Sequence, residues 1–317
     1  MRFGYHHSAF VGNGEKAPFQ AVLDRARRVE AAGFDLITFM DHVWQLPHNG
    51  QRDDPFFDCY TTLPAVAAVT DRIELSALVT CVGYRNPSLL AKMLATLDHA
   101  SDGRAVLGIG AGWYEAEYDA YGYEFPEPAT RVHQLRDAVR IAKAMWTEEP
   151  PVSFEGDHYA VEDAILEPKP VQDPHPPVMV GGGGEQLTLH VAAEHADRWN
   201  VPMADPETYE HKLSVLADHC ETVGRDYDEI EKTVLTFALL REDGEAAHEA
   251  YEELASKSES GPVPRDEYRG MVGTPEGAIE LAETFGDLGV EMVMTAVPRN
   301  DEETIDRLAD EVLPALA

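Results

Sequence analysis

The stretch from Ile73 to Trp113, "IELSALVTCVGYRNPSLLAKMLATLDHASDGRAVLGIGAGW", decides the fold because it contains one complete strand–helix–strand unit. The apolar runs Ile73–Val79 and Ala105–Ile109 each have the length of a buried strand. Between them, "PSLLAKMLATLDHAS" carries apolar residues at helical spacing. Two strands joined through a helix pair in parallel, so this stretch predicts an α/β fold with a parallel sheet.

The same alternation runs through the rest of the chain. Helical patterns such as "FQAVLDRARRVEAAG", which ends at Gly33, separate eight apolar runs. Eight strands alternating with helices over about 300 residues predict a (β/α)₈ TIM barrel. The competing architecture, an open doubly wound sheet, requires a GxGxxG fingerprint after the first strand, and "GYHHSAFVGNGE" lacks it. The predicted strands are Arg2–Tyr5, Leu36–Met40, Ile73–Val79, Ala105–Ile109, Val178–Gly181, Arg198–Val201, Val234–Leu240 and Glu291–Ala296.

We expect a single domain over residues 1–317 with two insertions. Residues 148–177 have the pattern of a short hairpin followed by a proline-rich return. Residues 255–272 are polar and interrupted by Gly261, Pro262 and Pro264, which indicates a mobile loop.

Composition excludes several classes of protein. Hydrophobic residues make up 44% of the chain, which is enough for a large core, and no run of about 18 apolar residues is present for a membrane span. The start, "MRFGYHHSAF", lacks the apolar core of a secretion signal. Cys59, Cys81 and Cys220 are too widely spaced for a disulfide framework or a CxxC metal site. A cytoplasmic protein is therefore expected.

Charge is the most unusual bulk property of the chain. There are 58 acidic residues against 25 Lys and Arg, a formal net charge of −33. A surface covered with carboxylates repels itself in dilute buffer and tolerates concentrated salt, where the screening length falls to about 3 Å at 1 M. The excess predicts a halophilic, archaeal source, and it makes nucleic acid a poor partner.

Polar and glycine-rich segments follow five of the predicted strands. In a (β/α)₈ barrel the active site forms at these carboxyl ends, so the five segments are the candidates for catalysis and binding. They are Tyr5–His7, Asp41–Trp44, Thr80–Pro87, Gly110–Glu117 and Gly181–Leu187.

The run "GGGGEQL" at Gly181–Leu187 predicts an anion site. Glycines let the backbone approach a ligand closely, and a helix opening directly after them presents free N–H groups to a phosphate. The competing interpretation is a flexible turn without a ligand.

Asp41 and His42 also have two interpretations. Asp41 can merely cap a turn, with His42 a loop histidine; alternatively, His42 transfers a proton near neutral pH while Asp41 orients it. Trp44, Trp113 and Tyr114 offer flat faces for a planar ligand, or they form a rim of core aromatics. A metal site is not predicted, because adjacent His6 and His7 face opposite ways in a strand and no HExxH spacing occurs.

Three blocks of this sequence resemble one known family over nearly the whole chain. They are "VEAAGFDLITFMDH" (29–42), "VTCVGYRNPSLLAKMLATLDHASDGRAVLGIGAGWYEAEYDAYG" (79–122) and "PPVMVGGGGEQLTLHVAAEHADRWN" (176–200). The family is the luciferase-like monooxygenase superfamily, and the blocks are most similar to its branch that depends on the deazaflavin coenzyme F420. The resemblance implies a TIM-type barrel with insertions, dimeric or larger (a dimer or tetramer).

The resemblance also implies roles for individual residues. The deazaflavin ring would lie in the barrel mouth beside Asp41 and His42, with His42 as proton donor. A non-prolyl cis peptide near Ala77–Leu78 would back the ring. The cofactor-binding positions implied in this way are Asp41, His42, Ala77, Leu78, Thr80, Ala111, Gly112, Gly182, Gly183, Gly184 and Glu185, with the phosphate at Gly183–Gly184, and the substrate-facing positions are His6, Trp44 and Trp113.

Two departures from the family pattern bear on the substrate. Trp113 stands where the sugar-phosphate dehydrogenases have a catalytic glutamate, and His6 stands where methylene-tetrahydromethanopterin reductases have one. The expected reaction is hydride transfer between reduced deazaflavin and a small organic molecule, with a methylene-tetrahydropterin or methylene-tetrahydrofolate as the most concrete substrate. An FMN-dependent monooxygenase and a non-catalytic barrel that binds a flavin-like ligand are the alternatives.

Overall fold

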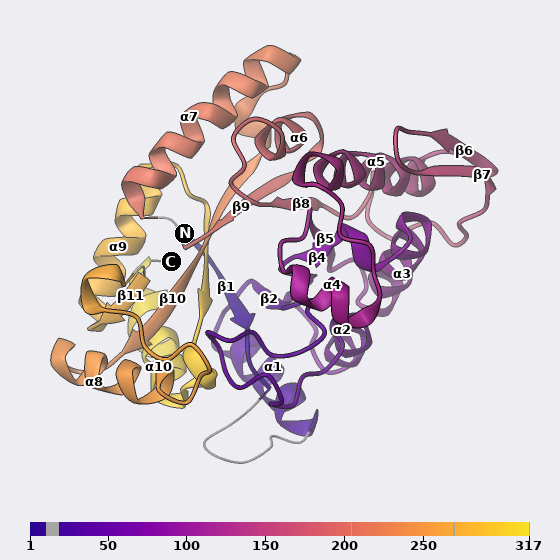
Figure 1. Ribbon diagram of the computed structural model, residues 1–317. Helices are drawn as coiled ribbons and strands as arrows, with labels where there is room; N and C mark the ends of the chain where they lie inside the picture. Colours follow the sequence, from indigo (N-terminus) through magenta and orange to yellow (C-terminus); the bar gives the residue numbers. More distant parts are fainter. Residues whose placement is uncertain (11–18, 204, 269, 317) are drawn as a thin grey trace. The chain divides into compact units, whose positions relative to one another are not determined.

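The computed structural model describes residues 1–10, 19–203, 205–268 and 270–316. The chain divides into two compact units. Figure 1 labels the helices and strands, and its colours follow the sequence. The first unit comprises Met1–Ile73, Val201–His211 and Lys232–Ala317, and the second comprises Glu74–Asn200 and Lys212–Glu231.

The first unit contains a parallel sheet in the order β11-β10-β12-β1-β2. Its strands are β1 (Arg2–His7), β2 (Leu36–Phe39), β10 (Glu231–Leu240), β11 (Gly270–Gly273) and β12 (Met292–Ala296). Its helices are α1 (Phe19–Ala31), α2 (Cys59–Ala67), α8 (Gly244–Ala255), α9 (Pro275–Asp287), α10 (Glu302–Arg307) and α11 (Leu313–Leu316), with a π-helical turn at Leu308–Val312.

The second unit contains parallel strands in the order β3-β5-β8-β9 and a separate antiparallel hairpin. The strands are β3 (Glu74–Ala77), β4 (Thr80–Cys81), which pairs with β5 (Ala105–Gly110), β8 (Val178–Gly181) and β9 (Arg198–Pro202); the hairpin strands are β6 (Val152–Glu155) and β7 (Ala160–Ala164). The helices are α3 (Pro87–Ala100), α4 (Glu115–Tyr121), α5 (Pro128–Thr147), α6 (Thr188–His195) and α7 (Pro206–Val223), which begins in the first unit.

The element order confirms the predicted (β/α)₈ barrel. Each of the eight predicted strands is present in the described ranges, and each is followed by at least one helix. The largest error at one boundary falls on Val234–Leu240, since β10 already begins at Glu231. The predicted strand Ile73–Val79 is interrupted, since β3 stops at Ala77 and the chain resumes pairing at Thr80. The sequence analysis also missed β11, which lies at the end of the polar segment 255–272 and pairs with β10.

Buried carboxylates on helices fix the connections around the hairpin in the second unit. Asp98, in the "ATLD" element of α3, accepts hydrogen bonds from the backbone N–H groups of Val171 (2.7 Å) and Gln172 (3.0 Å). Asp137 on α5 accepts one from the backbone N–H of His158 at 2.8 Å, in the hairpin turn. Both carboxylates are fully buried, so they satisfy backbone donors that packing removes from water.

None of the helices in the part of the chain that the structure describes is long and apolar enough to cross a bilayer.

Candidate active site

In the first unit, the carboxyl ends of β1 and β2 bring the predicted imidazoles next to each other. His6 pairs in register with Thr38, and His7 pairs with Phe39. Asp41 and His42 follow within three residues of the end of β2. Since neighbouring strands lie about 4.8 Å apart, the two strand ends form one continuous polar edge.

His6 is buried and held by a hydrogen bond across the two strands. Its Nδ1 lies 2.9 Å from the hydroxyl oxygen of Thr38. Burial, with a smaller contribution from the charge of nearby His42, lowers the pKa of His6 to about 3. His6 is therefore a neutral hydrogen-bonding group at physiological pH and does not supply an acid.

His7 belongs to the core rather than to the site. Its ring lies between the rings of Phe10 and Phe39, with centroids at 4.9 and 5.1 Å, and its Nδ1 has no hydrogen-bond partner among the described residues. Burial, followed by the charges of Arg25 and His6, lowers the pKa of His7 well below its ordinary value. The two adjacent histidines thus both remain neutral.

Asp41, His42 and Trp44 line the segment that follows β2. Asp41 is only 4% exposed, whereas His42 and Trp44 are half-buried and remain within reach of a ligand. The guanidinium carbon of Arg52 lies 4.1 Å from the centroid of the Trp44 ring, so this indole already carries a cation on one face. His42 is thus the accessible imidazole at this edge, and it is close enough to His6 for its charge to lower the pKa of His6.

In the second unit, the break in the third predicted strand is a non-prolyl cis peptide. It joins Leu78 to Val79, so the predicted position at Ala77–Leu78 was wrong by one residue. Ala77 still belongs to β3 and is 1% exposed, because it completes the strand pairing before the chain turns. Val79 is half-buried, so its side chain, unlike that of Ala77, is partly accessible at the carboxyl end of the strand.

Glycines on two strands make room for this bulge. A Cβ added to Gly108 would lie 2.0 Å from the carbonyl oxygen of Ala77. A Cβ added to Gly110 or to Gly181 would lie 2.8 Å from a methyl carbon of Val79. The alternating glycines of "LGIGAG" are therefore required by close approach of the neighbouring chain.

The positions after β5 contain a further forced glycine. Gly112 has φ +79°, and a Cβ there would lie 2.5 Å from the Tyr118 hydroxyl and closer still to the sulfur of Cys81. Ala111 is half-buried beside it. Trp113 is 60% exposed and stacks on Tyr114 with ring centroids 5.1 Å apart, so it can present a face to a ligand.

Thr80, the next predicted cofactor contact, is fully buried in β4. Its hydroxyl oxygen accepts a hydrogen bond of 3.3 Å from Arg85. Arg85 lies in the candidate segment Thr80–Pro87, but the sequence analysis gave it no role of its own.

The glycine run after β8 forms a turn with a fixed backbone. The Trp199 indole donates a 2.9 Å hydrogen bond to the carbonyl of Gly182, whose own N–H donates to Asn200 at the same distance. A Cβ on Gly184 would lie 2.8 Å from the Thr188 hydroxyl. The prediction that the glycines open directly into a helix was wrong, because a turn at 185–187 precedes α6.

The acid in this turn is already paired. The Lys212 ammonium lies 2.5 Å from a carboxylate oxygen of Glu185, and the His219 ring nitrogen lies 2.7 Å from the Glu185 carbonyl oxygen. Lys212 offsets the charge that would otherwise oppose an anion at the glycines. Neither Lys212 nor Trp199 was found by sequence reasoning, because both contacts depend on tertiary packing.

The comparisons with known proteins give the family. A sequence model of the luciferase-like monooxygenases matches residues 1–309, and the chain belongs to this family. It is 29% identical over 341 residues to the F420-dependent glucose-6-phosphate dehydrogenase of Microbacterium testaceum, covering 100% of this chain and 97% of that one.

Solved structures share the fold. An F420-dependent secondary alcohol dehydrogenase in complex with an F420–acetone adduct aligns with a TM-score of 0.84 at 22% identity, covering 100% of this chain and 99% of the other. The coenzyme F420-dependent tetrahydromethanopterin reductase from Methanopyrus kandleri aligns with a TM-score of 0.81 at 21% identity, with the same coverage. These alignments confirm the (β/α)₈ barrel.

Proposed function

We propose that this protein is an F420-dependent oxidoreductase that transfers hydride between the deazaflavin and a small organic substrate. The observation that carries the proposal is the glycine turn Gly182–Gly184, whose backbone is held by Trp199 and whose acid, Glu185, is neutralised by Lys212. Such a turn before a helix fits the phosphate of the coenzyme. The full-length similarity to an F420-dependent relative supports the same cofactor.

The residues present would also fit the planar ring of the coenzyme. The second unit contributes the cis peptide Leu78–Val79 and the backbone of Ala111–Gly112, whose close packing requires glycine at 110, 112 and 181. When bound, F420 supplies a ring carbon that gives or accepts hydride. The chain supplies orientation and a site from which water is excluded.

In the first unit, we assign His42 to the accompanying proton transfer. His42 is half-buried and follows β2, and its neighbour Asp41 is buried, as expected of a carboxylate that orients a catalytic imidazole. His6, which burial keeps neutral, is assigned a hydrogen bond to the substrate, and Trp44 is assigned a contact with it. The exposed Trp113 of the second unit is assigned a stacking role. We further propose that the protein forms a homo-oligomer, that its other partner is the small substrate, and that it acts in the cytoplasm.

For the substrate, we propose a methylene-tetrahydropterin or methylene-tetrahydrofolate, reduced to its methyl form. Oxidation of a sugar phosphate is the competing reaction, favoured by the name of the Microbacterium relative. The exposed Trp113 stands where the sugar-phosphate dehydrogenases have a catalytic glutamate and argues against this reaction, because an indole cannot accept a proton. His6 counts in the same way against a pterin or folate, since the methylene-tetrahydromethanopterin reductases have a glutamate at that position.

The second candidate function is an FMN-dependent monooxygenase, which the description of the matching family favours. Titration with F420 and FMN separately, followed by fluorescence in high salt, decides between the two. We expect F420 to bind more tightly. Tight FMN binding without measurable F420 affinity would promote the monooxygenase. Turnover assays with the methylene-pterin, methylene-folate and glucose-6-phosphate then assign the substrate.

A further inference from the structure

The turn that follows β12 presents an arginine beside the candidate active-site edge of the first unit. Strand β12 pairs with β1, where Ala296 is in register with His6, and β1 pairs with β2 on its other side. The residues after β12 therefore lie about 10 Å, two strand spacings, from those after β2. Arg299 is the third residue beyond the end of β12.

The backbone around Arg299 is held in place by Asn300. Arg299 and Asn300 both adopt left-handed conformations, with φ of 49° and 55°. The buried Asn300 side chain accepts a hydrogen bond from the Tyr5 hydroxyl (2.8 Å) and donates one to the carbonyl of Ala9 (2.7 Å). Non-glycine residues in this conformation are uncommon and persist where surrounding contacts impose them.

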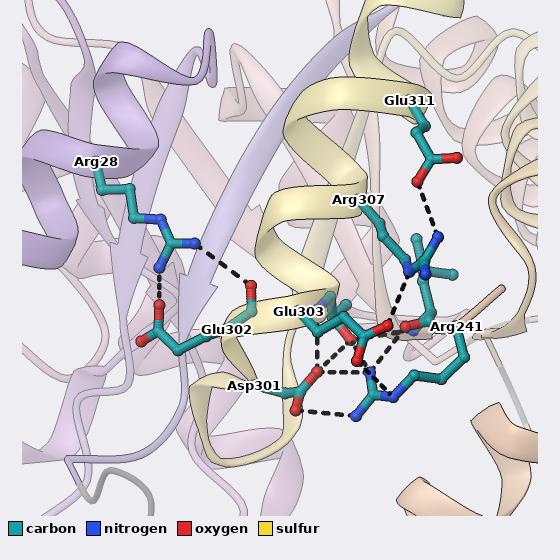
Figure 2. Close-up of polar contacts among 9 residues, drawn as sticks. Arg28, Arg241, Asp301, Glu302, Glu303, Arg307 and Glu311 are labelled. Carbon is teal, nitrogen blue, oxygen red and sulfur yellow. Dashed lines mark hydrogen bonds and ion pairs between the residues drawn. The ribbon is translucent and has the colours of Figure 1, made fainter.

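The acidic residues that follow Arg299 are all engaged by other arginines. Figure 2 shows Arg28 reaching Glu302, and Arg241 reaching Asp301 at 2.8 Å. Glu303, also drawn there, pairs with Arg241 and Arg307 at 3.2 and 3.1 Å. This network fixes the start of α10 and leaves these carboxylates committed elsewhere.

Arg299 itself is enclosed but not saturated with hydrogen bonds. Its side chain is 15% exposed, and its buried Nη1 makes no hydrogen bond within the described ranges. The Asp54 carboxylate lies 3.6 Å from Nη1, and the same oxygen accepts a 2.9 Å hydrogen bond from the backbone N–H of Gln51. Asp54 thus balances charge without using the donors of the guanidinium.

We propose that Arg299 is an anion-binding residue that holds a carboxylate or phosphate group of the ligand in the active site. A chain with a net charge of −33 repels anionic ligands, so a carboxylate or phosphate needs a local cation with free donors. The planar guanidinium suits either anion. This assignment rests on the proposed function, in which the anion belongs either to the substrate or to the glutamate tail of F420.

Thermal unfolding with inorganic phosphate tests the site without turnover. Phosphate replaces KCl at constant ionic strength. The proteins compared are wild type, Arg299→Gln, Arg299→Lys and a control, Arg27→Gln, which removes an exposed arginine on α1 paired with Asp24. We expect phosphate to stabilise wild type and the control, and the apparent phosphate affinity to fall about tenfold or more in Arg299→Gln, with Arg299→Lys between them. A phosphate effect that is absent in wild type, or unchanged in Arg299→Gln, overturns the proposal.

A second measurement identifies the source of the anion. Binding of F420 and of its riboflavin-like core, which lacks the phosphate and glutamates, is followed by fluorescence in wild type and Arg299→Gln. A loss confined to F420 assigns the anion to the cofactor tail, and equal binding in both proteins assigns it to the substrate; either result supports the site if the phosphate effect depends on Arg299. Failure of wild type to bind F420 defeats the proposed function and leaves the phosphate experiment valid.

Discussion

The strand ends of the two units differ in the kind of residue they present. In the first unit they carry ionisable side chains, His6, His42 and Arg299; His6 is hydrogen-bonded to Thr38, and Arg299 lies 3.6 Å from the Asp54 carboxylate. In the second, the ends of β5 and β8 and the residues after them are rich in glycines, whose backbone is closely packed against neighbouring residues. Ionisable groups can move protons and hold charge, whereas a bare backbone accommodates a flat ring and a phosphate. In the proposed function, the chemistry is accordingly assigned to the first unit and cofactor binding to the second.

The largest expected effect tests the chemical half of this comparison. His42→Ala should lower turnover about 10²–10⁴-fold, the range for a lost general acid or base, with F420 affinity changed much less. Steady-state kinetics and fluorescence titration measure the two quantities. Near-normal turnover would return His42 to the role of a loop histidine.

The binding half is tested in the glycine turn. Gly183→Asp places a carboxylate at the proposed phosphate position, so F420 affinity should fall about 100-fold or more while the protein remains folded. Fluorescence titration measures the affinity, and circular dichroism checks the fold. If the affinity is unchanged, the glycines form only a turn and the phosphate binds elsewhere.

Salt should affect both units together, because the net charge of −33 belongs to the whole chain. Raising KCl from low to molar concentration screens the repulsion, and the melting temperature should rise steeply, by about 5–10 °C. Thermal unfolding followed by circular dichroism measures this. A flat or falling melting temperature would remove the halophilic interpretation.

The packing behind the cofactor surface can be tested by a double substitution. Gly110→Ala sets a Cβ 2.8 Å from a Val79 methyl carbon and should cost about 1–3 kcal/mol of unfolding free energy. Val79→Ala removes the clashing methyls, so the double variant should recover part of that loss. Denaturant unfolding of the single and double variants measures the coupling. Additive losses would show that Val79 does not force the glycine.

The smallest effect concerns His6. Its pKa of about 3 in the folded chain lies below the ordinary value of 6.5, so the unfolded chain binds more protons between these values. The contribution of neutral His6 is therefore complete above about pH 6.5 and is lost as the pH falls toward 3. In His6→Asn, the decline of the unfolding free energy between pH 6.5 and 5 should be shallower by about 1 kcal/mol per pH unit.

The control is the same change at a half-buried histidine on α5 of the second unit, His133→Asn, which should leave the pH dependence of the unfolding free energy close to that of wild type. Denaturant unfolding at several pH values compares the three proteins. A His6→Asn profile that parallels wild type would mean that His6 is not buried in its neutral form.

The sequence by itself determined the succession of strands and helices, because apolar period and glycine placement are local properties. It also predicted that His42 and the glycine run follow strands, since both come directly after strongly apolar runs. It placed the cis peptide one residue early, because a motif gives the neighbourhood of a bulge and the packing of Val79 against Gly110 and Gly181 decides its position.

Only the tertiary structure decided which charges are paired. Lys212 neutralises Glu185 from 27 positions along the chain, and Arg241 reaches Asp301 from 60 positions away. The same holds for His6, whose neutrality comes from burial and a hydrogen bond to Thr38 on the next strand. The sequence gives the identity of each ionisable side chain. Its desolvation and its pairing with another charge depend on contacts between distant segments, which form only when the chain folds.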